Sequence, residues 1–311
     1  MDHPVHEWWL TDGGCLPVHD TEETGGLRIL VAGATGYLGR HIVRELNDRG
    51  HHVRALARSP ARLEPLRAAA EEVFTADATD RTALAGCCDG VDVVVSTVGL
   101  VGKGGRQTCW DVDYGANRNL LDEAERAGVA RFVYVSVVRA PALEKLQLVR
   151  AKRAFEQALR NSGMAHAVLL PNGYFSDFDA YLDMARKGRV FLFGDGGFRI
   201  NPVDGADVAA AAADAVTGDA DEVEIGGPDV LTHEQIAHQA FQALGTTPRI
   251  THVPAWLLAS ALALMRRLTP LRVHGVLEFP LTVLTHDVLS PATGQRHLAD
   301  HYGQAAAGPA G

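Results

Sequence analysis

Three glycines that follow a short apolar run constrain the fold of this chain more than any other feature. The apolar run extends from Leu27 to Ala32, and the glycines are Gly33, Gly36 and Gly39. A helical pattern of apolar residues begins directly after Gly36. We therefore predict a buried strand, a glycine turn and a helix in succession. The backbone N–H groups and the dipole at the start of such a helix bind a pyrophosphate well.

Each glycine has its own expected role in that turn. Gly33 permits the tight turn, Gly36 lets the backbone approach the phosphates, and Gly39 lets the helix pack closely on the strand. The alternative is a glycine-rich turn without a ligand. The strand before the glycines and the helix after them favour the nucleotide site.

Strand and helix patterns then alternate as far as residue 187. We expect strands at 27–32, 52–57, 72–76, 91–96, 130–136 and 165–170, and long helices at 108–127 and 143–161. This alternation predicts an α/β fold with a Rossmann-type, doubly wound parallel sheet, which binds ligands beyond the carboxyl ends of its strands. The residues expected at that edge are Gly33, Arg58, Asp77, Thr97, Ser136 and Pro171.

The rhythm of the pattern changes near residue 188, where short strands and glycine turns begin. We expect residues 27–187 to form a nucleotide-binding domain and residues 188–303 to form a smaller mixed α/β lobe that makes the substrate pocket. Residues 1–26 are expected to be an N-terminal extension and residues 304–311 a frayed tail. The apolar stretch 256–268 is expected to be a helix of the lobe or the face of a homodimer. A membrane-surface anchor is its alternative, because the stretch is short for a span.

Composition excludes several classes of function. The net charge of −9 disfavours a nucleic-acid partner. The first 26 residues lack the pattern of a signal peptide, and the four cysteines lack the spacing of a metal site. His233 and His238 are five residues apart and would lie on different faces of a helix, so they do not make a zinc motif. Ser136 lacks a nucleophile elbow, which disfavours a hydrolase. We expect a cytoplasmic protein that binds a small molecule and no metal.

Arg58 occupies the position at which this fold reads the ribose. It follows Gly39 by nineteen residues, close to the usual offset of about 20. An acidic residue there would bind the 2′-hydroxyl of NAD, whereas the guanidinium of Arg58 suits the 2′-phosphate of NADP. NADP(H) is therefore expected in preference to NAD(H). The alternative is a solvated arginine at a strand end.

Taken together, these motifs resemble the atypical short-chain dehydrogenase/reductases, in particular the NmrA-like, NAD(P)H-binding family that includes isoflavone-reductase-type enzymes. The resemblance runs from about residue 27 to about residue 301. It implies that the cofactor lies along Gly33, Thr35, Gly36, Tyr37, Leu38, Gly39, Arg58, Asp77, Ala78, Thr97, Val98, Gly99, Lys152, Pro171, Asn172 and Gly173. It also implies Lys152, Ser136 and Tyr174 as catalytic candidates. The substrate pocket would be formed by Leu100, Val137, Val138, Tyr174, Phe175 and Phe178.

The chain departs from the family pattern in one important respect. Most enzymes of this superfamily have a tyrosine four residues before the lysine, and here that position is Leu148. Three interpretations remain open. Lys152, or a tyrosine such as Tyr174 or Tyr114, moves the proton; or hydride goes to a conjugated or quinone-like acceptor; or the protein senses NADP(H) without catalysis. Because the chain has four lysines among 29 lysines and arginines, a lysine at this position favours a specific role.

The function expected from the sequence is an NADPH-dependent oxidoreductase that transfers hydride to a small, fairly apolar carbonyl or conjugated substrate. A redox-neutral epimerase or isomerase that keeps its NAD(P) bound is one alternative. A non-catalytic, NmrA-like regulator that senses NADP(H) is the other.

Overall fold

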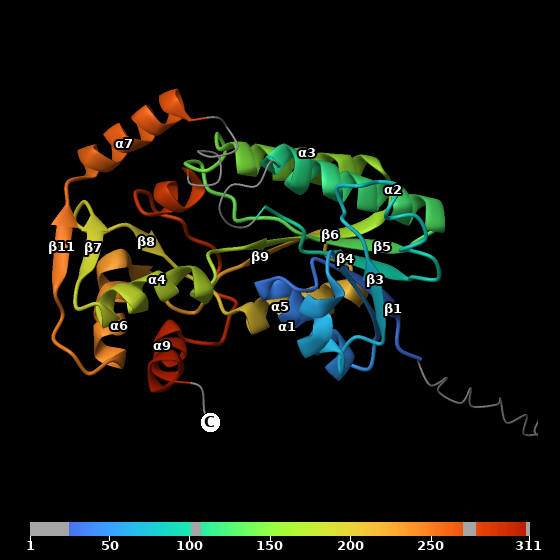
Figure 1. Cartoon of the computed structure of the whole chain (residues 1–311), viewed down its shortest axis with the longest axis horizontal. Coiled ribbons are helices and arrows are strands. Elements are labelled where there is room, and N and C mark those ends of the chain that lie inside the picture. Colours follow the sequence, from blue (N-terminus) through green and yellow to red (C-terminus); the bar gives the residue numbers. More distant parts are fainter. Residues whose placement is uncertain (1–24, 101–106, 270–277, 309–311) are drawn as a thin grey trace, which may run out of the picture.

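The computed structural model describes residues 25–100, 107–269 and 278–308. Most of the expected N-terminal extension and the last three residues of the expected tail lie outside this range. Seven parallel strands form the main sheet in the order β3-β2-β1-β4-β5-β6-β9 (Figure 1). The strands are β1 (Arg28–Ala32), β2 (His52–Ala57), β3 (Glu72–Thr75), β4 (Val93–Ser96), β5 (Arg131–Val135), β6 (Ala165–Pro171) and β9 (Glu222–Ile225).

Helices cover both faces of the sheet, as the alternating pattern predicts (Figure 1). One face carries α1 (Tyr37–Asp48) and α5 (Gly205–Thr217). The other carries the π-helical turn η2 (Trp110–Ala116), its continuation α2 (Asn117–Ala127), and α3 (Gln147–Asn161). A 3₁₀ segment, η1 (Pro60–Leu66), follows β2. The parallel, doubly wound Rossmann-type fold predicted from the sequence is confirmed.

The strands are apolar because they are buried on both faces. In β1, Ile29 and Val31 pack with α1 and α5, whereas Leu30 and Ala32 pack with α2 and α3. Every residue of β4 is buried. Successive side chains of a strand point to opposite faces, so a strand between two helical layers needs apolar residues at all positions.

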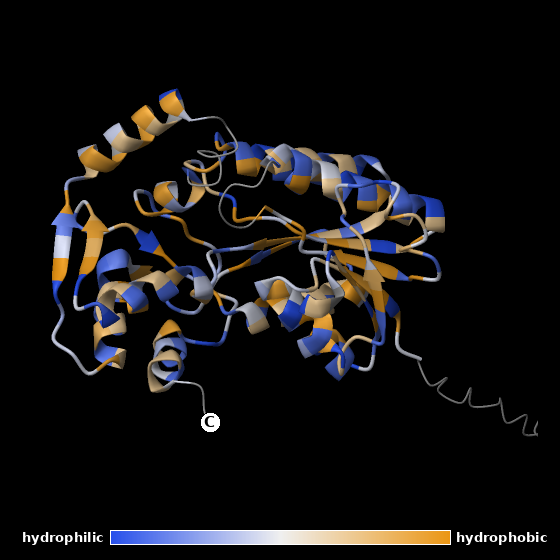
Figure 2. Cartoon of the chain, viewed as in Figure 1, coloured by the Kyte–Doolittle hydropathy of each residue, from blue (hydrophilic) through white to orange (hydrophobic). Residues whose placement is uncertain are grey.

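The smaller lobe is built mostly from residues after β6. Its helices are α4 (Phe175–Arg186), α6 (His233–Ala243), α7 (Ala255–Leu268) and α9 (Leu298–Ala307). Strands β7 (Val190–Phe193) and β11 (Ile250–Val253) pair in parallel, and β8 (Arg199–Ile200) and β10 (Leu231–Thr232) pair in antiparallel fashion. Helices α4, α6 and α9 share an apolar core, whereas α7 extends along the rim of the lobe with apolar residues at its surface (Figure 2).

Two segments differ from the expectations for residues beyond 187. The sequence pattern placed α5 and β9 among the elements that cap the sheet, but β9 pairs with β6 and α5 packs beside α1. The chain therefore returns to the main sheet after building part of the lobe. Residues 304–307, expected to begin the tail, continue α9, which the buried Tyr302 anchors by donating a hydrogen bond to the Phe178 carbonyl (2.7 Å). In the described part of the chain, no helix is long and apolar enough to cross a membrane.

Candidate functional site

The glycine turn between β1 and α1 has the geometry of a phosphate cradle. Gly33 has a left-handed φ of 80°, and a Cβ atom there would lie 2.5 Å from Thr97 Oγ1. At Gly39, a Cβ atom would lie 2.2 Å from the Gly33 carbonyl oxygen, so helix and turn touch. Gly36 is exposed and begins α1 without a side-chain cap. The first N–H groups of α1 therefore have no side-chain cap and are available to bind an anion.

The residues after β2 and β3 flank this turn at the same edge of the sheet. Arg58 follows β2 and is exposed, and among the described residues no acidic side chain pairs with it. Asp77 follows β3 and accepts hydrogen bonds from the Thr79 N–H (2.9 Å) and hydroxyl (2.8 Å). The Asn119 amide donates to the Ala78 carbonyl at 3.1 Å. A guanidinium that is free of carboxylates is available for a phosphate, whereas the Asp77 carboxylate first shapes its own loop.

The loop after β4 lies against the glycine turn. Thr97 donates a hydrogen bond from Oγ1 to the Ala32 carbonyl at 3.0 Å. The Val98 carbonyl accepts a hydrogen bond from the buried side chain of Asn117 at 3.0 Å, which fixes the loop to α2. At Gly99, a Cβ atom would lie 3.0 Å from Asp113 Oδ1 and 3.5 Å from Lys152 Nζ. Thr97, Val98 and Gly99, which are all expected to contact the cofactor, thus connect the glycine turn with a buried charged pair.

That pair, Asp113 and Lys152, is the main feature that sequence reasoning missed. Lys152 Nζ, on α3, lies 3.2 Å from Asp113 Oδ1 and donates to the Val135 carbonyl at 3.4 Å. The ammonium group also lies over the Tyr134 ring, 5.3 Å from its centroid. Asp113 Oδ2 accepts the Leu100 N–H at 3.2 Å. The ammonium is therefore fixed at the carboxyl end of β5, beside Gly99.

Electrostatics explain why the two charges occur together. Asp113 has no exposed surface, and burial raises the pKa of its carboxyl group while the neighbouring Lys152 ammonium opposes that shift. Asp113 lies in the π-helical turn η2, which inserts an extra residue per turn and is a common feature of functional sites. No spacing in the sequence links Asp113 to Lys152, so the pairing could not be read from the chain.

Ser136 directly follows Val135, whose carbonyl accepts a hydrogen bond from Lys152, but the Ser136 hydroxyl bonds to another residue. Its hydroxyl donates to the buried carboxylate of Glu156 at 2.5 Å, one helical turn beyond Lys152 on α3. Arg153 and Arg139 also bond to Glu156, at 2.6 and 3.0 Å. This network joins the end of β5 to α3, and the catalytic role expected for Ser136 stays a prediction.

Tyr174 lies on the other side of the sheet edge from Lys152, next to the start of α1. Its ring centroid is 5.6 Å from that of Tyr37, and its own residue is the N-cap of α4. Burial and the nearby Asp177 carboxylate raise the pKa of the Tyr174 hydroxyl. The Tyr37 hydroxyl accepts the Gly205 N–H at 3.2 Å. Tyr174 therefore joins the glycine turn to the lobe, and the catalytic role expected for it stays a prediction.

The segment after β6 connects the two lobes through a pair of asparagines. The buried Asn172 donates from Nδ2 to Asn201 Oδ1 at 2.7 Å and to the Val288 carbonyl at 3.0 Å. Asn201 in turn donates to the carbonyls of Gly227 (3.1 Å) and Ser290 (2.9 Å). The side chain of Asn172 is thus occupied by structural hydrogen bonds. Pro171 and Gly173 flank it at the carboxyl end of β6, and contact with the cofactor stays a prediction for all three.

Four of the six residues expected to line the substrate pocket belong to the core of the smaller lobe. They are Val137, Val138, Phe175 and Phe178, and all are buried. Leu100 and Tyr174 are partly exposed. The four residues therefore pack in the core of the lobe, and their contact with a substrate stays a prediction.

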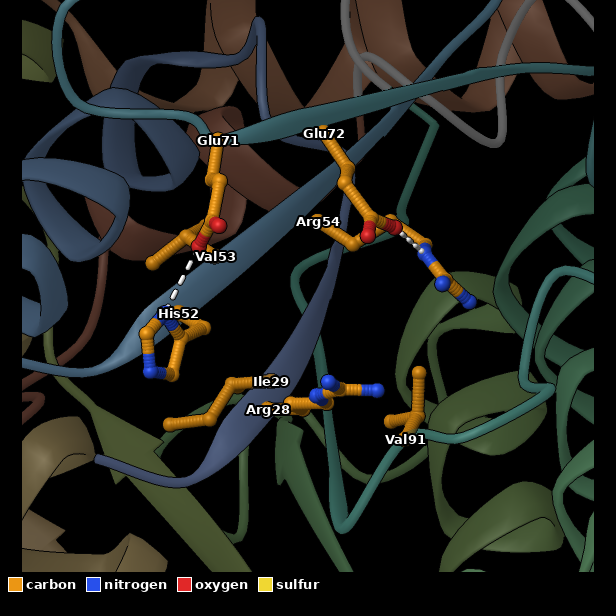
Figure 3. Close-up of a pocket in the computed structure, with 8 residues that line it drawn as sticks. All are labelled: Arg28, Ile29, His52, Val53, Arg54, Glu71, Glu72 and Val91. Atoms are coloured by element: carbon orange, nitrogen blue, oxygen red, sulfur yellow. Dashed lines mark hydrogen bonds and ion pairs between the residues drawn. The ribbon is translucent and has the colours of Figure 1, made fainter. Parts of the chain in front are cut away.

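A pocket is also present at the opposite edge of the sheet. It lies at the amino ends of β1, β2 and β3, between two ion pairs, His52 with Glu71 (2.7 Å) and Arg54 with Glu72 (2.6 Å) (Figure 3). These four side chains already pair with one another. Because parallel sheets bind nucleotides at their carboxyl edge, we assign the candidate site to the glycine turn and the Asp113–Lys152 pair.

Comparison with known proteins shows the family to which the chain is related. A family model described as NAD(P)H-binding matches residues 33–219. Divinyl chlorophyllide a 8-vinyl-reductase of Zea mays is 34% identical over 250 residues, which cover 73% of this chain and 61% of that protein. The chain therefore spans about three-fifths of the length of that plant relative.

Two further similarities come from bacteria. A Streptomyces griseus protein named (4-alkanoyl-5-oxo-2,5-dihydrofuran-3-yl)methyl phosphate reductase is 33% identical over 224 residues, 70% of this chain and 74% of its own. A quinone oxidoreductase of Escherichia coli, solved in complex with NADPH, has a TM-score of 0.66 and 23% identity, and the match covers 89% of this chain and 99% of that one. The structural similarity establishes the shared fold.

Proposed function

Because this chain belongs to the NAD(P)H-binding family, we propose that it is an NADPH-dependent reductase of a small, fairly apolar molecule with a conjugated carbon–carbon double bond. The observation that carries the proposal is the buried Lys152 ammonium, which Asp113 holds beside Gly99. Leu148 stands one helical turn before Lys152, where a tyrosine would otherwise donate a proton to a carbonyl oxygen. A fixed cation beside the loop that follows β4 suits an acceptor on which negative charge develops during the reaction, because the cation stabilises that charge.

The names of two relatives support this choice of acceptor. The plant relative is named as a vinyl reductase and the Streptomyces griseus relative as a reductase of a dihydrofuranone. Both names describe reduction, and a vinyl group is a carbon–carbon double bond. A carbonyl or quinone-like acceptor is the broader class that the same lysine could serve.

The residues present fit a dinucleotide. Gly36 and the open N–H groups of α1 would hold the pyrophosphate, and Arg58 would bind the 2′-phosphate. Reduced nicotinamide, when bound, supplies a hydride. Lys152 Nζ would donate a hydrogen bond to the ribose or to the electron-withdrawing group of the acceptor, where negative charge gathers. Asp113 keeps that ammonium oriented, and the Leu100 N–H fixes Asp113 from the other side.

The cofactor preference is tested by titrating the protein with NADPH and NADH and following nicotinamide fluorescence. We expect NADPH to bind more tightly, because a guanidinium–phosphate hydrogen bond contributes about 1.5–3 kcal/mol. Arg58→Ala should lose about tenfold or more in NADPH affinity and little in NADH affinity. Arg44→Ala, an exposed arginine on α1, is the matched control and should bind both as the wild type does. Equal affinity of the wild type for the two cofactors would remove the role of Arg58.

The reductase activity is tested by NADPH oxidation in the presence of conjugated enones and quinones, with mass analysis of the product. We expect two added hydrogens at the double bond, one as hydride from the reduced nicotinamide and one as a proton from water or from Lys152. Lys152→Ala should reduce kcat by about 10²-fold or more, while Lys152→Arg should retain part of it. Unchanged turnover in Lys152→Ala would exclude Lys152 from the reaction. NADPH binding without turnover of any acceptor would favour the sensor, and activity without net NADPH oxidation would favour the epimerase.

A further inference from the structure

Helix α7 (Ala255–Leu268) is apolar yet lies at the surface. Of its described side chains, Leu258 is buried and the others are exposed or partly exposed. Trp256 is 66% exposed, Leu264 57% and Leu268 70%. A helix that is apolar on most sides is normally found in a protein core or a membrane environment. Neither surrounds α7 within the described residues, and the helix extends along the outer rim of the lobe (Figure 2).

The exposed residues form an ordered stripe. Leu257, Ala261, Leu264 and Leu268 are separated by four, three and four residues, so they share one helix face, and all four are exposed. Trp256 and Arg267 are eleven residues apart, which also places them on one side of the helix, along the border of that stripe. Tryptophan and arginine combine an apolar body with a polar or charged end, and both are favoured where an apolar phase meets water.

The charge of α7 is opposite to that of the whole protein. The chain has a net charge of −9, whereas residues 254–269 contain two arginines, Arg266 and Arg267, and no acidic residue. Of the two, Arg267 is exposed and lies beside the stripe, where its guanidinium is complementary to anionic lipid headgroups. A charged side chain at this place is less suited to a purely apolar protein groove.

From these observations we propose that α7 docks the protein onto an anionic lipid surface, with the stripe of Leu257, Ala261, Leu264 and Leu268 inserted among the acyl chains. Trp256 and Arg267 lie at the headgroup level. The helix is fourteen residues long and lies in the plane of the surface rather than across it. Residues 254–269 contain no acidic residue, so the same helix of a second copy would give Arg267 no counter-charge, whereas an anionic lipid surface supplies one. The proposal does not depend on the function proposed above.

The test uses the full chain and phosphatidylcholine vesicles with and without phosphatidylglycerol, in a co-sedimentation assay. We expect binding to the vesicles with phosphatidylglycerol, weaker binding to phosphatidylcholine alone, and a loss of binding as salt is raised. Binding should also shift the tryptophan emission to shorter wavelength, and Trp256→Phe should remove most of that shift. Equal binding to both vesicles, or binding to neither, would overturn the proposal.

Matched variants separate the stripe from general surface effects. The double variant Leu264→Ser/Leu268→Ser should bind vesicles at least about tenfold more weakly, because binding then no longer removes two large apolar side chains from water. Phe191→Ser removes an exposed aromatic residue on β7 and should bind normally. Arg267→Glu should abolish the preference for phosphatidylglycerol, while Arg249→Glu, at the opposite end of β11, should not. A dimer in solution that the double variant dissociates, without vesicle binding by the wild type, would show that the stripe binds a second copy and would overturn the lipid proposal.

Discussion

At the scale of single residues, the sequence identified one half of the central pair and missed the other. Lys152 stood out because lysine is rare in this chain and because it matched a family position. Asp113 resembled any acidic residue on a helix, which is usually solvated. In the structure, Asp113 is buried in η2 and accepts a hydrogen bond from the Leu100 N–H. Neither feature can be inferred from the spacing of residues in the sequence. Sequence reasoning therefore finds unusual residue types more readily than it finds their partners.

The pair makes a prediction about stability. Asp113→Asn leaves the buried Lys152 ammonium without its charge partner, which should lower the free energy of unfolding by about 3–5 kcal/mol. Lys152→Met should cost less, because burial already raises the pKa of Asp113 and lets the carboxyl group take up a proton. The double variant should be clearly more stable than the sum of the two losses implies.

Urea unfolding of the four proteins at neutral pH provides this double-mutant cycle. A coupling energy above about 0.5 kcal/mol is expected for groups in contact. Additive effects within that limit would mean that the two charges do not stabilise each other, and Asp113 would then have no part in holding the ammonium. NADPH affinity measured on the same variants shows whether the loss extends to the cofactor site.

At the scale of elements, local patterns placed most helices and strands of the main sheet correctly. The expected strands at 52–57 and 72–76 agree with β2 and β3 to within a residue. The glycine turn also formed where the pattern placed it. The partner of β9 was not predictable, since the alternation Glu-Val-Glu-Ile indicates an exposed edge strand but does not identify the sheet to which it belongs.

The glycine turn gives a matched pair of substitutions. Gly39→Ala places a Cβ atom 2.2 Å from the Gly33 carbonyl oxygen and 2.9 Å from Ala34 Cα, both of them backbone atoms. We expect it to lower the free energy of unfolding by about 1–3 kcal/mol, because α1 must shift away from β1. Gly36 has a φ of −71°, which alanine also adopts, and a Cβ atom there would lie 3.2 Å from its nearest neighbour, the Gly33 carbonyl oxygen. Gly36→Ala should fold nearly as well as the wild type.

The two variants should differ in which property they change, NADPH affinity or stability. Gly36 is exposed at the start of α1, so a methyl group there should weaken NADPH binding without much change in the urea midpoint. For Gly39→Ala, the midpoint itself should fall. The interpretation of this turn as a phosphate cradle would fail if Gly36→Ala bound NADPH as tightly as the wild type.

At the scale of the whole molecule, buried polar groups lie where the main sheet meets the smaller lobe. Asn172 and Asn201 connect β6 of the main sheet with the lobe, and each makes hydrogen bonds to segments far apart in the sequence. The family resemblance implies a contact of Asn172 with the cofactor, which stays a prediction, and the structure shows that its side chain also joins the main sheet to the lobe. Contacts of this kind depend on how distant segments assemble, so patterns within a short window do not reveal them.

The buried His233 connects protonation to the stability of the whole protein. Its ring stacks on Tyr181 with centroids 6.1 Å apart, Nδ1 lies 2.8 Å from the Tyr181 hydroxyl, and Nε2 lies 3.2 Å from the Val283 carbonyl. A carbonyl can only accept, so Nε2 carries the proton and Nδ1 accepts from Tyr181 in the neutral ring. Burial lowers the pKa of His233 from its ordinary value near 6.5. Protonation is therefore easier in the unfolded chain.

Because the unfolded chain then binds more protons than the folded one below about pH 6.5, stability should fall as the pH falls through that range. We expect His233→Gln, which cannot be protonated, to make the urea midpoint less dependent on pH between 7 and 5.5. His297 serves as the control of opposite sign, since a hydrogen bond to Asp229 raises its pKa and its contribution is lost as pH rises. His297→Gln should leave the loss on acidification as large or larger. If His233→Gln lost stability on acidification as steeply as the wild type, the pH dependence would have to come from other groups, such as His41 and His51, whose pKa values burial also lowers.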